Sequence, residues 1–285
     1  MNPNYDLLIT SIQNERVKQW ASLLDKKHRD RSGQFIIEGV HLVMEALKSG
    51  IDVGVIIYDN ERGIPVELRQ ESKLGTTGYE AAKAAEWVQA SRSVMAKCTG
   101  TDTPPPVFAV VSKPEHDQSA LYRENSLVVV LDGVRDPGNV GTIIRSADAV
   151  AADAVILGKG CVDLYNPKTV RSTMGSLFHL PIIEGDLTEL MPAARERGIK
   201  LVGTSLQATH TCYSYDWKQP TWLLMGSESD GLSQDVRLQL DESVIIPMPG
   251  GSESLNVATA TAVLLFEGLR QRKFNQTIIP VQLLK

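Results

Sequence analysis

The sequence is poor in cysteine, in aromatic residues and in long apolar runs. Its 285 residues include three cysteines, and aromatic side chains make up 6% of the chain. Cys98, Cys161 and Cys212 are odd in number and widely spaced, which argues against a disulfide framework and fits a reducing cytoplasm. The longest mainly apolar stretch, residues 257–266, is too short to cross a bilayer. Residues 1–10 lack the basic start and apolar run of a secretory signal, so we expect a cytoplasmic protein without membrane contact.

Several common catalytic motifs are also missing. His210 and Cys212 have the spacing of metal ligands, but no second pair accompanies them, so we expect no metal site. No Gly-x-Ser-x-Gly elbow is present to support a serine hydrolase. No Walker A loop or early dinucleotide fingerprint is present either, which disfavours an ordinary nucleotide-dependent enzyme such as a dehydrogenase.

The charge is unevenly distributed, although the net charge is only −5. Between residues 16 and 31 six basic residues accompany two acids, Asp25 and Asp30. The basic residues are Arg16, Lys18, Lys26, Lys27, Arg29 and Arg31. From charge alone, a solvated helix face is the simpler interpretation, and a surface that binds phosphates is the alternative.

Hydrophobic patterning divides the chain at the polar residues 112–125. We predict an N-terminal domain of residues 1–113, a linker of residues 114–125 and a second domain of residues 126–285. In the first, we expect helices at 17–24, 40–48 and 79–95, and strands at 34–37, 53–58 and 107–111. In the second, we expect strands at 127–131, 154–157, 200–203, 221–225 and 243–246, and helices at 140–151, 167–174, 187–197 and 255–272. The alternation predicts an α/β fold with a largely parallel sheet.

Ligands of parallel sheets bind at the carboxyl ends of the strands, which here directs attention to three loops. The loop before the helix at 140–151 contains Asn139, which is either the N-cap of that helix or a functional group. The loop at 226–233 is rich in Gly and Ser and exposes backbone groups to a nucleoside or phosphate, while Glu228 is either solvated or functional. The third loop brings Ser254 and Asn256 to the start of a buried helix, which either residue can cap. We expect the two later loops to share one ligand pocket.

Taken in order, these loops resemble the motifs of the SpoU/TrmH class of SPOUT RNA methyltransferases. The first motif is present as Asn139, Gly141 and Arg145-Ser146-Ala147, and the second as Gly226, Glu228 and Gly231. The third is present as Ile246-Pro247-Met248 and Ser254-Leu255-Asn256-Val257-Ala258. Asn166-Pro167-Lys168 and residues 171–175 are also similar to the family, with Thr173 where a serine is usual.

The first half is similar to the substrate-binding domain that precedes many members. The similarity is carried by residues 9–11, Asn14, Lys18 and residues 35–39. It implies a small α/β fold like that of ribosomal protein L30e, followed by the trefoil-knotted α/β domain of SPOUT enzymes. The basic residues between 16 and 31 lie inside this domain, so the resemblance favours their role as RNA contacts.

The resemblance implies transfer of a methyl group from S-adenosylmethionine to a ribose 2′-hydroxyl of RNA by a homodimer that associates through its catalytic domain. Large-subunit ribosomal RNA is the favoured substrate. A transfer-RNA methyltransferase and a non-catalytic RNA-binding protein that retains the fold are the alternatives. The implied catalytic residues are Asn139, Arg145, Glu228, Ser254 and Asn256. The implied cofactor contacts are Thr204, Gly226, Ile246, Met248 and Leu255.

The role of Arg145 has two interpretations. The family often assigns the arginine at this position as the base that removes the hydroxyl proton. A guanidinium is nearly always protonated in proteins, which favours a second role, gripping the phosphate beside the target ribose. In that interpretation Glu228 orients Arg145, and Ser254 and Asn256 hold the ribose or its backbone.

Overall fold

The computed structural model describes residues 7–73, 75–251 and 254–274. Their contacts form two compact units. The N-terminal unit comprises Met1–Glu115 with Asp163–His179, and the C-terminal unit comprises His116–Val162 with Leu180–Lys285. The sequence predicted contiguous domains and placed residues 163–179 with the second. None of the helices within the described ranges has the length and apolar character needed to cross a membrane.

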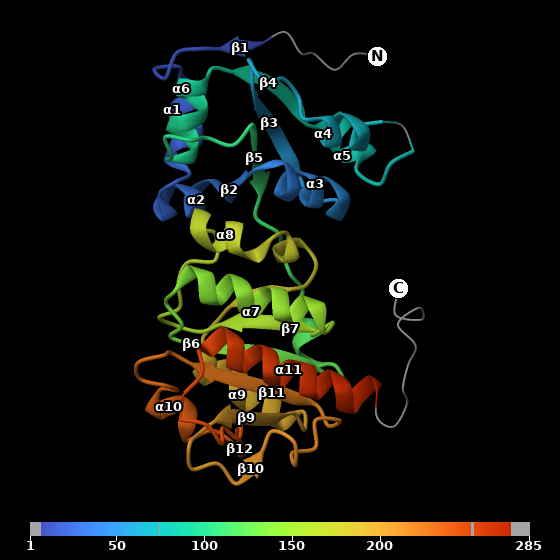
Figure 1. Ribbon diagram of the computed structural model, residues 1–285, viewed down its shortest axis with the longest axis vertical. Coiled ribbons are helices and arrows are strands. Elements are labelled where there is room, and N and C mark those ends of the chain that lie inside the picture. The colour runs from blue at the N-terminus through green and yellow to red at the C-terminus, as the bar shows by residue number, and fades with distance from the viewer. Residues whose placement is uncertain (1–6, 74, 252–253, 275–285) are drawn as a thin grey trace. The chain divides into compact units, whose positions relative to one another are not determined.

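The N-terminal unit is built on a mixed five-stranded sheet with the order β1-β4-β3-β5-β2 (Figure 1). The strands are β1 (Leu8–Ile9), β2 (Gln34–Glu38), β3 (Val53–Asp59), β4 (Glu86–Ala90) and β5 (Val107–Ser112). Strands β1, β4 and β3 are parallel, whereas β5 runs antiparallel to both β3 and β2. The strands predicted at 34–37, 53–58 and 107–111 are therefore confirmed.

Helices cover both faces of this sheet (Figure 1). On one face, α1 (Glu15–Ser22) packs against α6 (Arg92–Thr99), and Trp20, Met95 and Phe108 meet in the core between them and the sheet. On the other, α3 (Val40–Ser49) packs against α4 (Val66–Glu71) and α5 (Tyr79–Ala84). Two further helices, α2 (Lys26–Ser32) and α8 (Pro167–Thr173), both contact β2 at the edge of the sheet.

The single helix predicted at residues 79–95 is wrong. The structure divides this segment into α5, β4 and α6, with Ala85 in an extended conformation between the first two. Strand β4 is paired on both sides, with β1 and β3, and its Trp87 and Val88 are buried. Tertiary pairing and burial therefore override a local pattern that resembles a helix.

The C-terminal unit contains a seven-stranded sheet in which every pairing is parallel, with the order β10-β12-β9-β11-β6-β7-β8. The strands are β6 (Leu127–Asp132), β7 (Ala154–Leu157), β8 (Ile182–Glu184), β9 (Lys200–Thr204), β10 (His210–Thr211), β11 (Thr221–Gly226) and β12 (Glu242–Ile245). This arrangement confirms the predicted α/β fold with a largely parallel sheet.

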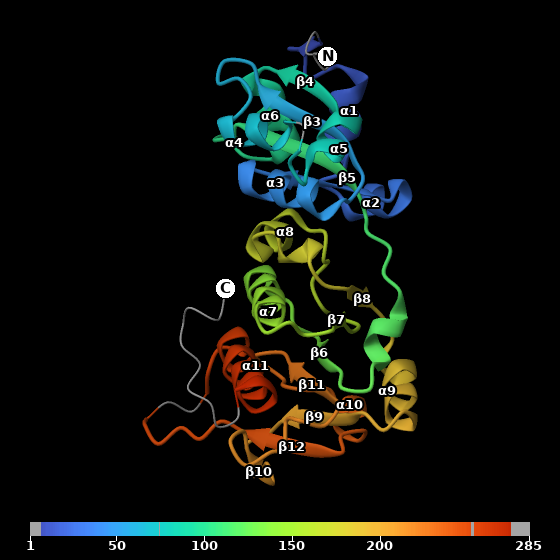
Figure 2. The ribbon, with the colours of Figure 1, turned by 90° about the vertical axis from the view of Figure 1, so that its right-hand side faces the viewer.

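The helices of this unit lie on opposite faces of the sheet (Figure 2). On one face, α7 (Pro137–Ala149) packs against α11 (Val257–Lys273). On the other, α9 (Leu187–Glu196) and α10 (Gln234–Arg237) close a core that includes Met191, Val236 and Trp222.

The end of α11 is held by one half-buried cation. The guanidinium of Arg272 donates hydrogen bonds to the carbonyl oxygens of Asn125, Ser126, Trp217 and Gln219. Desolvation lowers the pKa of Arg272 from its ordinary value. These carbonyls precede β6 and β11, so Arg272 ties the last helix to the starts of two central strands.

Candidate active site

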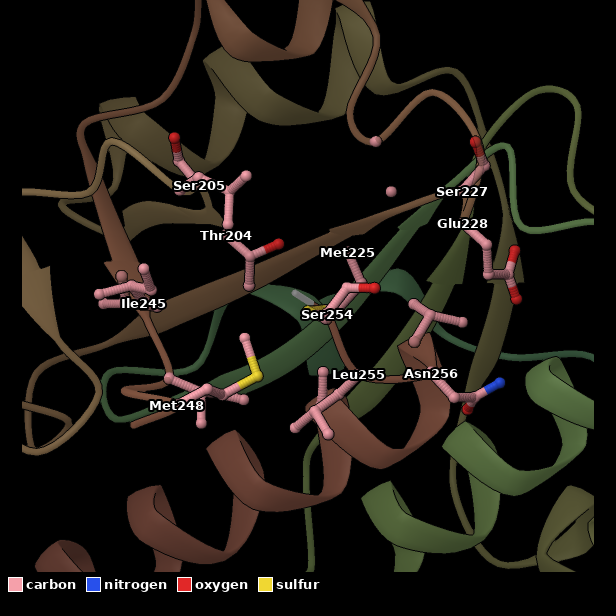
Figure 3. A pocket seen from close by; sticks show the side chains of 17 residues that line it. Thr204, Ser205, Met225, Ser227, Glu228, Ile245, Met248, Ser254, Leu255 and Asn256 are labelled. Atoms are coloured by element: carbon pink, nitrogen blue, oxygen red, sulfur yellow. The ribbon is translucent and has the colours of Figure 1, made fainter. Parts of the chain in front are cut away.

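A cavity of about 460 Å³ lies at the carboxyl ends of three neighbouring strands, β12, β9 and β11 (Figure 3). Ligands of parallel α/β sheets bind at this position, and the volume is typical of small-molecule pockets. Glu228 and Asn256 lie at one end of the cavity, and Ile245 and Met248 lie at the other. The cavity therefore has a polar end and an apolar end. Its lining comes from residues 204–206, 225–228, 231, 244–246, 248, 254–257 and 260.

The structure brings the predicted cofactor residues together. All five of them, Thr204, Gly226, Ile246, Met248 and Leu255, line this cavity. They come from three strand ends and from the start of α11, which shows that the two late loops do share one pocket. Their contact with a cofactor stays a prediction. Residues 252 and 253 of the third loop lie outside the described residues.

The loop after β11 requires a glycine at its first position. A Cβ added at Gly226 would lie 2.0 Å from the carbonyl carbon of Gly231 and 2.2 Å from the backbone nitrogen of Leu232. Ser227 and Gly231 also form two backbone hydrogen bonds, of 3.1 and 3.0 Å, which close the loop on itself. The loop is therefore a tight turn that leaves its remaining backbone groups at the cavity wall.

Two charged side chains that the sequence reading missed hold this loop in place. The carboxylate of Asp132, a largely buried residue, accepts a hydrogen bond of 2.7 Å from the backbone nitrogen of Ser233. The guanidinium of Arg237 donates to the carbonyl oxygens of Leu232 and Asp230 at 2.6 and 2.9 Å. Asp132 ends β6 and Arg237 lies in α10, so the loop is fixed from two sides. The one sequence signal for Asp132 was an acid at the end of an apolar strand.

Three of the predicted catalytic residues form one hydrogen-bonded chain. The side-chain amide of Asn256 donates to the Oδ1 of Asn139 at 3.0 Å, and the amide of Asn139 donates to the carboxylate of Glu228. Ser254 also lines the cavity. The structure therefore brings three of the five predicted catalytic residues together at the polar end of the cavity and a fourth, Ser254, into the lining.

Asn139 is not the N-cap of α7, which corrects one of the two interpretations of this residue. Asp136 is the cap: its carboxylate accepts from the backbone nitrogen of Asn139 at 2.8 Å, and Pro137 occupies the first helical position. The side chain of Asn139 is consequently available to Glu228 and Asn256.

At α11 the cap is Asn256, whose Oδ1 accepts hydrogen bonds from the first turn of the helix. Ser254, the other candidate, does not cap this helix.

Arg145 lies apart from this chain of side chains. It is exposed on α7 and does not line the cavity, and its side chain makes no hydrogen bond or ion pair with the residues that the structure describes. Glu228, which was expected to orient Arg145, contacts Asn139 instead. The structure therefore leaves the predicted catalytic role of Arg145 a prediction, with its guanidinium exposed on α7.

The six basic residues between 16 and 31 do not form one uniform surface. Arg29 is 2% exposed, donates to the carbonyl oxygen of Leu23 at 2.7 Å and forms an ion pair with Asp163, so it does not belong to an RNA surface. Arg16 is paired with Glu86 and lies over the ring of Trp20.

The other four basic residues are exposed. Lys18 pairs with Glu15 at 2.7 Å, and Lys26 lies 3.9 Å from Asp163. Lys27 and Arg31 make no ion pair with any residue in the described ranges. These two side chains are the ones most available to an external anion.

Known proteins share this architecture along nearly the whole chain. Residues 126–266 match the SpoU rRNA Methylase family, and residues 14–109 match the MRM3-like substrate binding domain. The chain is 37% identical over 258 residues to the 23S rRNA (guanosine(2553)-2'-O)-methyltransferase of Bacillus subtilis (strain 168), covering 90% of this chain and 97% of that relative. It is also 37% identical over 277 residues to the 23S rRNA (uridine(2479)-2'-O)-methyltransferase of Streptomyces viridochromogenes, covering 94% of each.

The fold is also shared with a solved structure. The SpoU methyltransferase AviRb from Streptomyces viridochromogenes, in complex with the cofactor AdoMet, superposes with a TM-score of 0.80 and 35% identity, covering 91% of this chain and 98% of that one. The fold and the cavity define an α/β protein with a ligand site at the ends of parallel strands. The chain belongs to the SpoU rRNA methylase family, which confirms the resemblance found in its motifs.

Proposed function

We propose that the protein transfers a methyl group from S-adenosylmethionine to a ribose 2′-hydroxyl of large-subunit ribosomal RNA. The observation that carries this proposal is the cavity itself. The three family motifs, distant in sequence, meet at its polar end through Asn139, Glu228 and Asn256. The names of the two relatives, both 23S rRNA 2′-O-methyltransferases, support the choice of substrate.

The residues present fit the cofactor. Met248 and Leu255 offer apolar surface for a base, while the requirement for glycine at Gly226 leaves backbone groups within reach of a ribose. When bound, S-adenosylmethionine supplies an activated methyl group on its sulfonium. The described residues contain no cluster of three His, Cys, Asp or Glu side chains arranged for a metal, and the proposed chemistry uses none.

The protein has two tasks in this reaction, because a ribose hydroxyl is a poor nucleophile. It must hold the hydroxyl oxygen in line with the methyl group, and it must assist loss of the hydroxyl proton. We assign to Arg145 a grip on the phosphate next to the target ribose, because its guanidinium is exposed and has no partner among the described residues. Asn139 and Glu228 fix the polar end of the cavity against which the ribose is placed.

Four finer features belong to the same proposal. The motifs imply a trefoil knot in the C-terminal unit and an L30e-like fold in residues 1–113. They also imply a homodimer formed through the catalytic domain. The dimer is supported by Phe266, which is 51% exposed on α11, the helix that packs on α7. A cytoplasmic location is supported by three free cysteines. The molar mass in solution, for the wild type and Phe266→Glu, tests the dimer.

Ligand binding and methyl transfer test the proposed function. S-adenosylhomocysteine, ATP and NAD are compared by thermal shift, since a ligand that binds only the native state raises its stability. We expect a rise with S-adenosylhomocysteine alone. Methyl transfer is then measured on deproteinised ribosomal and transfer RNA. Transfer to transfer RNA alone would support the tRNA alternative, and cofactor binding or RNA binding without transfer would support a non-catalytic role.

A further inference from the structure

The segment Asp163–His179 has an unexpected location. It lies within the part of the chain that matches the methylase family, yet its contacts group it with the N-terminal unit. It contains α8 and the family-like motif Asn166-Pro167-Lys168. The proposed methyl transfer uses none of the side chains that this segment exposes.

Buried and half-buried contacts fix the segment to the N-terminal unit. Asp163 is paired with the buried Arg29 of α2, and Arg171 donates to the buried carboxylate of Glu38 at 2.8 Å. The ring of Tyr165 lies 4.6 Å from that of Phe35, measured between centroids. The orientation of α8 relative to α2 and β2 is therefore fixed by specific partners.

The turn that ends α8 is also fixed. Met174 has a φ of 51°, a left-handed conformation that side chains other than glycine rarely adopt, and its carbonyl accepts a hydrogen bond of 3.0 Å from His41 Nε2. A Cβ added at the next residue, Gly175, would lie 2.7 Å from Cγ of Glu45. Because strained backbone persists only where its surroundings hold it, this turn is a built feature.

Helix α8 presents an exposed face with positive charge. Lys168 and Arg171 of the helix and its C-cap Met174, three residues apart in turn, are exposed, whereas Val170 and Thr173 are buried. Lys168 makes no ion pair with any side chain in the described parts of the chain. Arg171 is neutralised by Glu38, whereas residues 164–179 contain no acid, so Lys168 supplies the unpaired positive charge of this face.

The carboxylate of Asp163 connects this face to α2. Asp163 lies 3.9 Å from the ammonium of Lys26 and is also paired with Arg29, and α2 exposes Lys27 and Arg31 as well. Two short helices that both contact β2 therefore carry exposed cations, and one acid at the base of α8 holds the helices together.

We propose that the exposed face of α8 binds the phosphodiester backbone of the substrate RNA, with Lys168 as its principal contact. The RNA-binding surface of the N-terminal unit is then made of two segments distant in sequence, α2 and α8. Asp163 and Glu38 are positioning residues, because they hold α8 through Arg29 and Arg171. This inference rests on the proposed function, since it takes the RNA substrate from there.

Charge reversal at one lysine tests the proposal in the full-length protein. Lys168→Glu is compared with Lys97→Glu, which makes the same change at an exposed lysine of α6 in the same unit. Affinity for deproteinised large-subunit RNA is measured as a function of salt. We expect Lys168→Glu to weaken binding about tenfold and to reduce the salt slope by about one, since each phosphate contact contributes about 0.7–0.9 to that slope. Lys97→Glu should bind as the wild type does.

A double-mutant cycle separates positioning from folding. Asp163→Asn removes the charge that holds Arg29, so the effect of Lys168→Glu should shrink in that background if Asp163 positions α8. Should Asp163→Asn fail to fold, Glu38→Gln replaces it in the cycle.

The inference is overturned if Lys168→Glu and Lys97→Glu bind RNA with the same affinity and salt slope while the wild type methylates it. A wild-type protein that binds S-adenosylhomocysteine but neither binds nor methylates ribosomal RNA overturns the proposed function as well, so the two failures differ.

Discussion

Asn256 donates a hydrogen bond from its side-chain amide to the Oδ1 of Asn139 at 3.0 Å, across 117 residues of sequence. The Oδ1 of Asn256 accepts from the backbone nitrogens of Ala258 and Thr259, so the first turn of α11 sets the orientation of its amide. Asn139 then has one orientation in which it can accept from Asn256 and donate to Glu228. A helix cap therefore determines the direction of the polar chain at the edge of the cavity.

Replacing Asn139 with aspartate should break the hydrogen-bonded chain of Asn256, Asn139 and Glu228. An ionised carboxylate cannot donate to Glu228, and it places a like charge beside it. We expect methyl transfer to fall by about 10²-fold, the size of effect seen when one oriented donor is lost from an active site. Single-turnover transfer rates measure this change. Asn14→Asp is the matched control, because Asn14 caps α1, where aspartate serves equally well. Equal transfer rates for the two variants would show that these three hydrogen-bonded side chains have no role in the mechanism.

Gly226→Ala should prevent cofactor binding. Its Cβ would overlap the backbone at Gly231, 2.0 Å away, and would force the cavity wall to move. Gly250→Ala is the control, since a Cβ added there meets nothing within 4 Å. Calorimetry with S-adenosylhomocysteine should show at least a tenfold loss of affinity for the first variant and none for the second. Unchanged affinity in Gly226→Ala, with unchanged melting temperature, would show that the loop does not form the ligand site.

Arg145→Ala should separate catalysis from cofactor binding. The guanidinium is exposed and does not line the cavity, so its loss should leave the affinity for S-adenosylhomocysteine within a few-fold. Methyl transfer should be abolished, because the phosphate beside the target ribose loses its partner. Calorimetry and single-turnover assays on the same preparation give both quantities. Retained transfer would remove Arg145 from the mechanism.

The stability of the N-terminal unit should depend on the ionisation of Glu38. Burial raises the pKa of this carboxyl, and the Arg171 guanidinium opposes the rise without cancelling it. A raised pKa in the folded state means that ionisation is less favourable there than in the unfolded chain. The contribution of Glu38 to stability is therefore present below pH 4.3 or so, which is about the pKa of the unfolded state, and is lost as the pH rises through the pKa of the folded state.

Glu38→Gln has no such titration. The melting temperature of the wild type, measured relative to this variant, should therefore decrease between pH 4 and pH 7. Glu67→Gln, at an exposed position of α4, should show no such trend. A difference that grows with pH would mean that attraction to Arg171 outweighs burial.

Periodicity and motif order predicted the C-terminal unit well. Its β6, β7, β9, β11 and β12 and its long helices appear within a few residues of their predicted positions, because buried parallel strands give continuous apolar runs that are easy to read. The motif loops could be placed at one edge of the sheet because parallel strands end at the same edge. Short edge strands such as β8 and β10 have too few residues to give a period, and they were missed.

What the sequence could not show depends on contacts between distant residues. Arg29 and Lys27 are equally basic in sequence, yet one is buried against Asp163 and the other is exposed. Asn139 was one candidate for the cap of α7, because asparagine and aspartate both favour that position, and Asp136 takes it with Pro137 at the first helical position. Partner choice of this kind is decided in three dimensions, so no local pattern reveals it.

The most direct test maps 2′-O-methylated nucleotides in large-subunit ribosomal RNA from cells with and without the gene. The account predicts that a 2′-O-methyl mark disappears on deletion, returns with the wild-type gene and stays absent with Arg145→Ala. An unchanged set of ribosomal RNA marks, or a mark restored by Arg145→Ala, would contradict it.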